Sequence, residues 1–170
     1  MTICTTLNRI RAHDPCARGW IELLAGLSKT KADDEPLPFS RIVEINGLND
    51  ALWACRVEPQ HAKEWRLFAV WCARRVEHLL TDARSVAAIN VAERHAHGMA
   101  TDGELSYAAW NAWNAWCYIN DGATDAPMEV AIANTAQAAA ETAWAVVHTL
   151  TEDVETETTT QIKKFLEIVG

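Results

Sequence analysis

The chain has 170 residues, 49% of them hydrophobic, and a formal net charge of -8. This length predicts one domain that buries roughly 70% of its unfolded surface and needs neither a disulfide nor a structural metal to fold. The negative charge argues against direct binding to nucleic acid or to an anionic membrane.

Two further features of composition bear on location. The five cysteines are odd in number and form no CxxC pair, which indicates buried thiols in a reducing compartment. No charged and apolar leader opens the sequence, and no apolar run reaches the ~18 residues needed for a membrane span. We therefore expect a cytoplasmic protein, with no cofactor and no metal indicated.

The charge is distributed unevenly. Residues 1–100 carry 13 Lys and Arg against 12 Asp and Glu, a balance of +1, whereas residues 101–170 carry 2 against 11, a balance of -9. A solvated acidic face is the simple explanation, because charge runs usually serve solubility. The functional alternative is a surface that docks on a basic partner.

The N-terminal third predicts short helices. Apolar spacing predicts a first helix over residues 2–12, and Asp14 with Pro15 is typical of a second helix start. Residues 29–38, KTKADDEPLP, lack periodicity and hold two prolines, so they predict a surface loop suited to partner recognition.

The middle of the chain predicts two further short helices and one long helix. Residues 39–45 form a helix closed by Asn46 and Gly47, and residues 48–57 form the next. A longer amphipathic helix follows over residues 60–80.

The second half predicts long helices. Asp82 caps a helix that ends at Gly98, and Thr101 with Glu104 forms a capping box for a tryptophan-rich helix that ends near Asn120. An alanine-rich helix is expected over residues 127–150. Residues 151–170 predict an acidic linker and a C-terminal amphipathic helix, packed on the body or on another subunit. The fold class is therefore all-α, a single-domain bundle of about seven or eight helices with no competing strand pattern.

Candidate catalytic and metal-binding residues are few. His95 and His97 stand two apart, which on a helix directs them about 200° away from each other, so they cannot hold one metal together. Cys72 is the candidate nucleophile, with Arg75 and His78 nearby in sequence, although a buried core thiol is the simpler interpretation. No catalytic residue is assigned, and an enzyme with a Cys/His site remains an alternative.

The tryptophan-rich helix carries the candidate partner site. Trp110, Trp113 and Trp116 recur every third residue and sweep across about 120° of the helix surface. They fit a packed core, or an interface in which one or two indoles stay exposed as anchors. With the acidic cluster that follows, the predicted partner-binding residues are Trp110, Trp113, Asn114, Glu152, Asp153, Glu155 and Glu157.

Arg84 carries a separate structural prediction. An arginine in the first turn of a helix opposes the helix dipole, so we expect it to pair with a carboxylate on a neighbouring helix, such as Glu64 or Glu77.

The run EWRLFAVWCARRVEHLLTDARSVAAINVAERHAHGMATDGELSYAAW, residues 64–110, resembles the Imm-5-like immunity protein domain, and the similarity extends to residue 150 as an Imm-5-like core. The positions that carry it are Trp71, Cys72, Ala73, Val76, Asp82, Arg84, Ala88, Ala92 and Gly98. The family has an Asp-Arg pair followed by a proline. In this sequence Ala83 separates Asp82 from Arg84, and Ser85 stands at the position of the proline. DPCARGW and KTKADDEPLP resemble the form carried by bacteriophages.

The resemblance implies a helical, non-catalytic protein that inhibits or sequesters a macromolecular partner, as an immunity protein or as a phage-encoded counter-defence inhibitor. The expected partner is a protein, such as a toxin or a nucleic-acid-binding defence protein with a basic surface. A self-associating scaffold, such as a homodimer joined through residues 162–169, is the third class.

Overall fold

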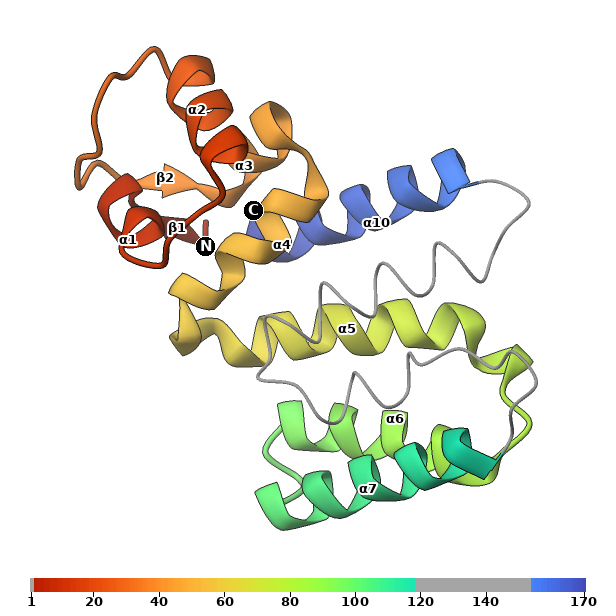
Figure 1. Ribbon diagram of the computed structural model, residues 1–170. Coiled ribbons are helices and arrows are strands. Elements are labelled where there is room, and N and C mark those ends of the chain that lie inside the picture. Colours follow the sequence, from red (N-terminus) through yellow and green to blue (C-terminus); the bar gives the residue numbers. More distant parts are fainter. Residues whose placement is uncertain (1, 119–153) are drawn as a thin grey trace.

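The computed structural model describes residues 2–118 and 154–170, without the side chains at positions 113 and 115–118 (Figure 1). In these residues the regular secondary structure is helical apart from one two-stranded sheet, which confirms the all-α fold class. The alanine-rich segment predicted over residues 127–150 lies outside the described residues, and so do Glu152 and Asp153.

Four short helices and the small sheet make up the N-terminal part. The helices are α1 (Leu7–Arg11), α2 (Ala17–Gly26), α3 (Phe39–Asn46) and α4 (Leu48–Ala54). The strands β1 (Cys4–Thr5) and β2 (Leu37–Pro38) pair antiparallel, with Cys4 opposite Pro38.

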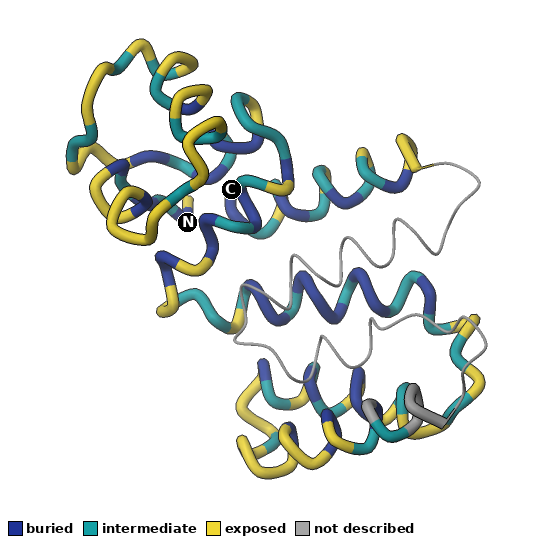
Figure 2. The backbone as a smooth tube through the Cα atoms, viewed as in Figure 1, coloured by how far each residue is buried: buried dark blue, intermediate teal, exposed yellow. Residues whose placement is uncertain are grey.

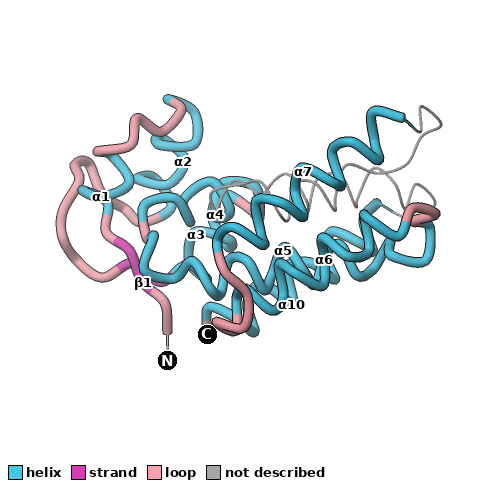
Figure 3. Tube along the Cα trace, turned by 90° about the horizontal axis from the view of Figure 1, so that it is seen from below, coloured by secondary structure: helices cyan, strands magenta, loops and turns pink. Residues whose placement is uncertain are grey.

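The rest of the described chain is built on α5 (Ala62–Val76). Short 3-10 turns η1 (Cys55–Val57), η2 (Pro59–His61) and η3 (Glu77–Leu79) flank it. In Figure 1, α10 (Val154–Val169) runs along one side of α5 and α6 (Ala83–Ala96) along the other. Helix α7 (Asp102–Tyr118) packs on α6 and lies on the near side of the molecule in Figure 3.

Several helix ends occur where the sequence predicts them. Gly47 and Gly98 adopt φ angles of 82° and 71°, the left-handed conformation that ends a helix without a Cβ clash. Asp82 caps α6 by accepting a hydrogen bond from the Arg84 amide at 2.8 Å. The capping box is present, since Thr101 N donates to Glu104 at 2.8 Å and Glu104 N donates to Thr101 Oγ1 at 3.2 Å.

Three local predictions in the N-terminal part are wrong. Residues 2–12 are not one helix, because β1 comes first and Thr6 then caps α1 by accepting from Arg9 N. Helix α2 does not begin at Asp14, whose φ of 52° is left-handed; Cys16 is the N-cap, and its Sγ accepts from Gly19 N at 3.4 Å. The predicted 29–38 loop ends in β2, so two-residue strands exist where none was expected.

The core is centred on an aromatic cluster that joins segments distant in sequence. Phe39, Trp65, Phe68 and Phe165 are all fully buried. The Trp65 ring centroid lies 5.2 Å from that of Phe39 and 6.1 Å from that of Phe165, and Phe68 meets Phe165 edge-on at 5.4 Å. Figure 2 shows α5 as the most continuously buried helix. One phenylalanine of α10 therefore completes contacts begun by α3 and α5.

The two ends of the described chain meet at the same place. Ile3 N donates to Val169 O at 2.8 Å, and Thr2 Oγ1 donates to Gly170 O at 3.2 Å. Val169 is 1% exposed. Helix α10 thus packs on the body of its own chain. Glu155 and Glu157 of the acidic cluster belong to this helix, which the structure describes from Val154.

Candidate functional site

Helix α7 presents an exposed aromatic face. Tyr107 and Trp110 are 69% and 58% exposed, whereas Ala108, Ala109 and Ala112 are buried on the side toward α6. Small residues let the two helices approach closely, whereas the large rings of Tyr107 and Trp110 stay exposed. Trp110 is therefore a surface residue and not a core residue. The side chains of Trp113 and Trp116 lie outside the described part of the structure.

A shallow groove between α6 and α7 borders this face. Its apolar lining includes Val91 and Ala108, and Tyr107 forms part of its wall. Arg84 and Glu104 line it as well. The predicted site residue Asn114 is half-buried and donates to Trp110 O at 2.9 Å, so its amide serves the backbone of its own helix.

The acidic cluster does not form one exposed face. Glu155 is exposed, but Glu157 is only 3% exposed, so the prediction that Glu157 faces solvent is wrong. Its carboxylate accepts three hydrogen bonds from the Arg75 guanidinium at 2.6 to 2.9 Å and one from Gln161 Nε2 at 3.3 Å. This bidentate pair raises the pKa of Arg75 and fixes α10 to α5.

Arg84 forms an ion pair within its own helix. Its guanidinium binds Asp82, the N-cap of the same helix, at 2.7 Å. Glu77 instead accepts from Arg74 at 2.7 Å. The Arg84 side chain and backbone N–H together lower the pKa of Asp82, so the cap and the unfavourably placed arginine stabilise each other locally.

The candidate nucleophile Cys72 lies in the core. It is fully buried, and burial raises the pKa of its thiol far above the usual range, with the nearby Glu157 charge adding to the shift. His78 is exposed on the 3-10 turn η3, which follows α5. A thiol in this setting stays protonated at neutral pH and is a poor nucleophile.

The histidines do not assemble a metal centre in the described residues. His95 Nε2 lies 2.8 Å from Asp102 Oδ1 across the α6–α7 turn. Within residues 2–118 and 154–170, no group of three or more His, Cys, Asp or Glu side chains is arranged to hold a metal ion.

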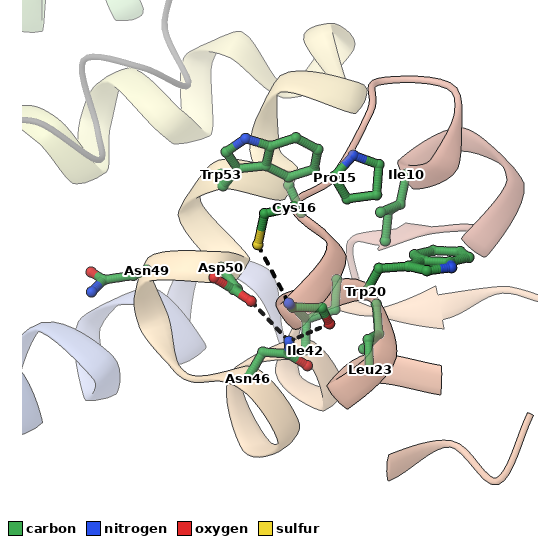
Figure 4. Close-up of a pocket in the computed structure, with 12 residues that line it drawn as sticks. Ile10, Pro15, Cys16, Trp20, Leu23, Ile42, Asn46, Asn49, Asp50 and Trp53 are labelled. Atoms are coloured by element: carbon green, nitrogen blue, oxygen red, sulfur yellow. Dashed lines mark hydrogen bonds between the residues drawn. The ribbon is translucent and has the colours of Figure 1, made fainter. Parts of the chain in front are cut away.

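A pocket that sequence reasoning missed lies between α2, α3 and α4 (Figure 4). Its walls are apolar, formed by the half-buried indoles of Trp20 and Trp53 with aliphatic side chains such as Leu23 and Ile42. The volume is about 200 Å³. The sequence places Trp20 and Trp53 on different helices 33 residues apart, so no local spacing could have predicted that they meet.

A small polar group forms one side of this pocket. Asn46 Nδ2 donates to Asp50 Oδ2 and to Gly19 O, both at 2.8 Å. A Cβ on Gly19 would stand 2.5 Å from Asp50 Oδ2, so only glycine lets α2 approach this carboxylate. Cys16 Sγ lies on the same side, and Asn49 points away from the other labelled residues (Figure 4).

Comparisons of the chain with protein-family models, with curated proteins and with solved structures gave no match. Among the described helices, none combines the length and the apolar character that crossing a membrane requires.

Proposed function

We propose that this chain is a non-catalytic cytoplasmic protein that binds a macromolecular partner and thereby inhibits or sequesters it. The observation that supports this most directly is the aromatic face of α7, with Tyr107 and Trp110 exposed one helical turn apart beside an apolar groove. Tyrosine and tryptophan are enriched among the residues that contribute most binding energy at interfaces, because each buries a large rigid surface at low entropic cost.

The chemistry of the cysteine argues in the same direction. A Cys/His enzyme needs a thiolate within reach of a base, whereas Cys72 is buried with a raised pKa and His78 is solvent-exposed on η3. The groove beside α7 contains Arg84, Glu104 and Asn111 as its polar residues, and these suit the rim of a protein interface.

The partner class follows from charge and from the family resemblance. Residues 101–170 carry a balance of -9, and the exposed Glu155 belongs to this part. Negative charge in this part of the chain favours a protein with a basic surface, because opposite charge speeds encounter and selects the partner. The Imm-5-like resemblance in its phage-carried form adds two specific candidates, a toxin and a nucleic-acid-binding defence protein.

Affinity capture with matched variants tests the proposal. The baits are the wild-type chain, the double variant Tyr107→Ser with Trp110→Ser, and the control Ile21→Ser, which removes an equally exposed apolar side chain (65%) from α2. We expect proteins from a bacterial lysate that wild type and control both retain and the double variant loses. Recovery of the same proteins by all three baits would contradict a role for the α7 face.

A charge-reversal variant tests whether negative charge contributes to partner binding. Glu155→Lys reverses an exposed charge and should weaken capture at low salt with unchanged folding, whereas Glu157 is unsuitable for this purpose because it binds Arg75.

Sedimentation of the wild type and of Trp110→Ser tests the alternative that a second copy of this chain occupies the face. A dimer that becomes a monomer on losing Trp110 would favour self-association.

A further inference from the structure

The pocket between α2, α3 and α4 has the size and shape of a small-molecule site. Its volume of about 200 Å³ exceeds the roughly 150 Å³ at which an apolar protein cavity holds a benzene molecule. Aliphatic side chains and two indoles form most of its lining. An occupant with one ring, or a short alkyl chain of similar size, would therefore fit and remove apolar surface from water.

The charge of the lining selects the kind of occupant. Asp50 brings a carboxylate to the pocket, and none of the side chains that line it is basic. Arg18, which lies close enough for the Asp50 charge to act on it, forms its ion pair with Glu22 at 2.9 Å. A carboxylate beside apolar walls is more favourable when a cation binds it.

A structural role explains part of the Asp50 position. It stands in the first turn of α4, where the helix dipole favours negative charge, and it accepts the Asn46 amide. These interactions orient the carboxylate without neutralising it. Asp50 also lines the pocket, so a ligand there can reach its carboxylate.

The two indoles favour the same occupant. The faces of tryptophan rings attract cations, more strongly where water is excluded. The Arg56 guanidinium lies 4.7 Å from the Trp53 ring centroid, a cation–π contact within the chain itself. Trp20 supplies a second indole to the pocket wall (Figure 4).

We infer that this pocket binds an organic ammonium ion with an apolar body, the ammonium group at Asp50 and the body between Trp20 and Trp53. Such a group occurs in free arylalkyl amines and at the end of a lysine side chain on a partner protein. The inference does not depend on the α7 face, which lies on another helix of the chain.

A comparison of charged and neutral ligands tests the site. The full chain is titrated with benzylammonium and with benzyl alcohol at low salt, and binding is followed through the indole N–H signals of Trp20 and Trp53 by NMR. We expect the ammonium ion to bind at least about tenfold more tightly than the alcohol, as a charge-assisted contact in a partly dry pocket provides. Equal affinities, or no saturable change with either ligand, would overturn the inference.

Variants assign the effect to Asp50. Asp50→Asn keeps the shape and the acceptor for Asn46, and the preference for the ammonium ion should fall to within about twofold. Glu44→Gln makes the same charge change at an exposed position on α3 outside the pocket and should keep the full preference. A preference that persists in Asp50→Asn, with circular dichroism showing an intact fold, would also overturn the inference.

A second ligand pair distinguishes the two sources of the ammonium group. N-acetyl-lysine methylamide is compared with N-acetyl-norleucine methylamide, which has a similar alkyl chain without the charge. An Asp50-dependent preference for the lysine compound supports a lysine side chain as occupant. The same preference for benzylammonium alone supports a free amine.

Discussion

Helices α7 and α10 differ in a way that their compositions do not suggest. Helix α7 is rich in aromatic residues, yet Tyr107 and Trp110 are mostly exposed. Helix α10 is rich in Thr and Glu, yet Phe165 and Glu157 are buried. The difference shows that burial is set by which neighbour covers a helix face. Helix α7 packs on α6, whereas α10 lies against both α3 and α5.

The largest expected effect comes from removing the aromatic contact of α10. Phe165→Ala should lower the free energy of unfolding by about 3–5 kcal/mol, because the ring is fully buried among Phe39, Trp65 and Phe68. Urea denaturation followed by circular dichroism measures this loss. The matched variant on α7, Tyr107→Ala, should stay within about 0.5 kcal/mol of wild type, since its ring is largely exposed.

If both variants lost similar stability, the contrast between the two helices would be wrong. A loss of several kcal/mol is a large share of the roughly 5–15 kcal/mol by which a domain of this kind is stable. Phe165→Leu, which keeps most of the apolar volume, should recover part of the loss.

The second prediction compares two glutamates of α10. Glu157→Gln should cost about 2 kcal/mol, between the values for exposed and fully buried ion pairs, because Glu157 is buried while the Arg75 side chain is 34% exposed. Glu155→Gln should change stability by less than about 0.5 kcal/mol. The same denaturation experiment reads both, and equal effects would show that the Arg75 pair does not fix α10.

The third prediction uses the Cys72 thiol as a reporter of α10 docking. Burial and the Glu157 charge raise the pKa of Cys72, so its alkylation in the native protein should be at least about 100-fold slower than that of the exposed Cys16. Iodoacetamide labelling with peptide mass spectrometry measures both rates. In Glu157→Gln the difference between the alkylation rates of Cys72 and Cys16 should become smaller. A Cys72 that reacts as fast as Cys16 in the wild type would contradict the burial of Cys72.

The smallest expected effect concerns pH at the start of α7. Hydrogen bonds from the Thr101 amide and hydroxyl, with a further one from Arg94, lower the pKa of Glu104 below its ordinary value of 4.5. The group therefore binds protons less readily when folded, and its stabilising contribution is present above about pH 4.5 and lost as pH falls through the lowered pKa.

Glu104→Gln keeps the capping geometry and removes the titration. The stability difference between wild type and this variant should be larger at pH 7 than at pH 3, as measured by thermal unfolding at each pH. A difference that does not change with pH would mean that the Glu104 charge does not contribute to the cap.

The sequence predicted local helix signals better than their surroundings. Asp82, Gly98 and the Thr101–Glu104 capping box were placed correctly, because each acts within a few residues of backbone. The prediction failed at Asp14, where a Cys16 cap replaced an Asp-Pro start. A thiol is an uncommon N-cap, so the residue preferences pointed to the wrong position.

Side-chain partners were predicted less well than helix ends. Arg84 was expected to pair with a carboxylate on a neighbouring helix, such as Glu64 or Glu77, and that prediction did not include its ion pair with Asp82, two residues away. Glu157 was expected in solvent, and it binds Arg75 from 82 positions along the chain. Such pairings depend on which helices become neighbours, and helical periodicity contains no information about that.

In the candidate sites, too, local features were predicted and contacts between distant residues were not. The tryptophan-rich helix was singled out from its sequence, but only its packing on α6 determined that Trp110 faces outward. The pocket around Asp50 was not predicted at all, because its indoles and its carboxylate come from different helices.

By itself, the sequence determined that this protein is helical, where most of its middle helices begin and end, and that its negative charge lies mainly after residue 100. Those properties follow from periodicity, capping and composition, which act locally. The tertiary structure alone decided that α10 is a core element, that α7 carries an exposed aromatic face, and that Trp20, Trp53 and Asp50 line one pocket. These depend on contacts between residues far apart in the chain, which form only when the helices pack.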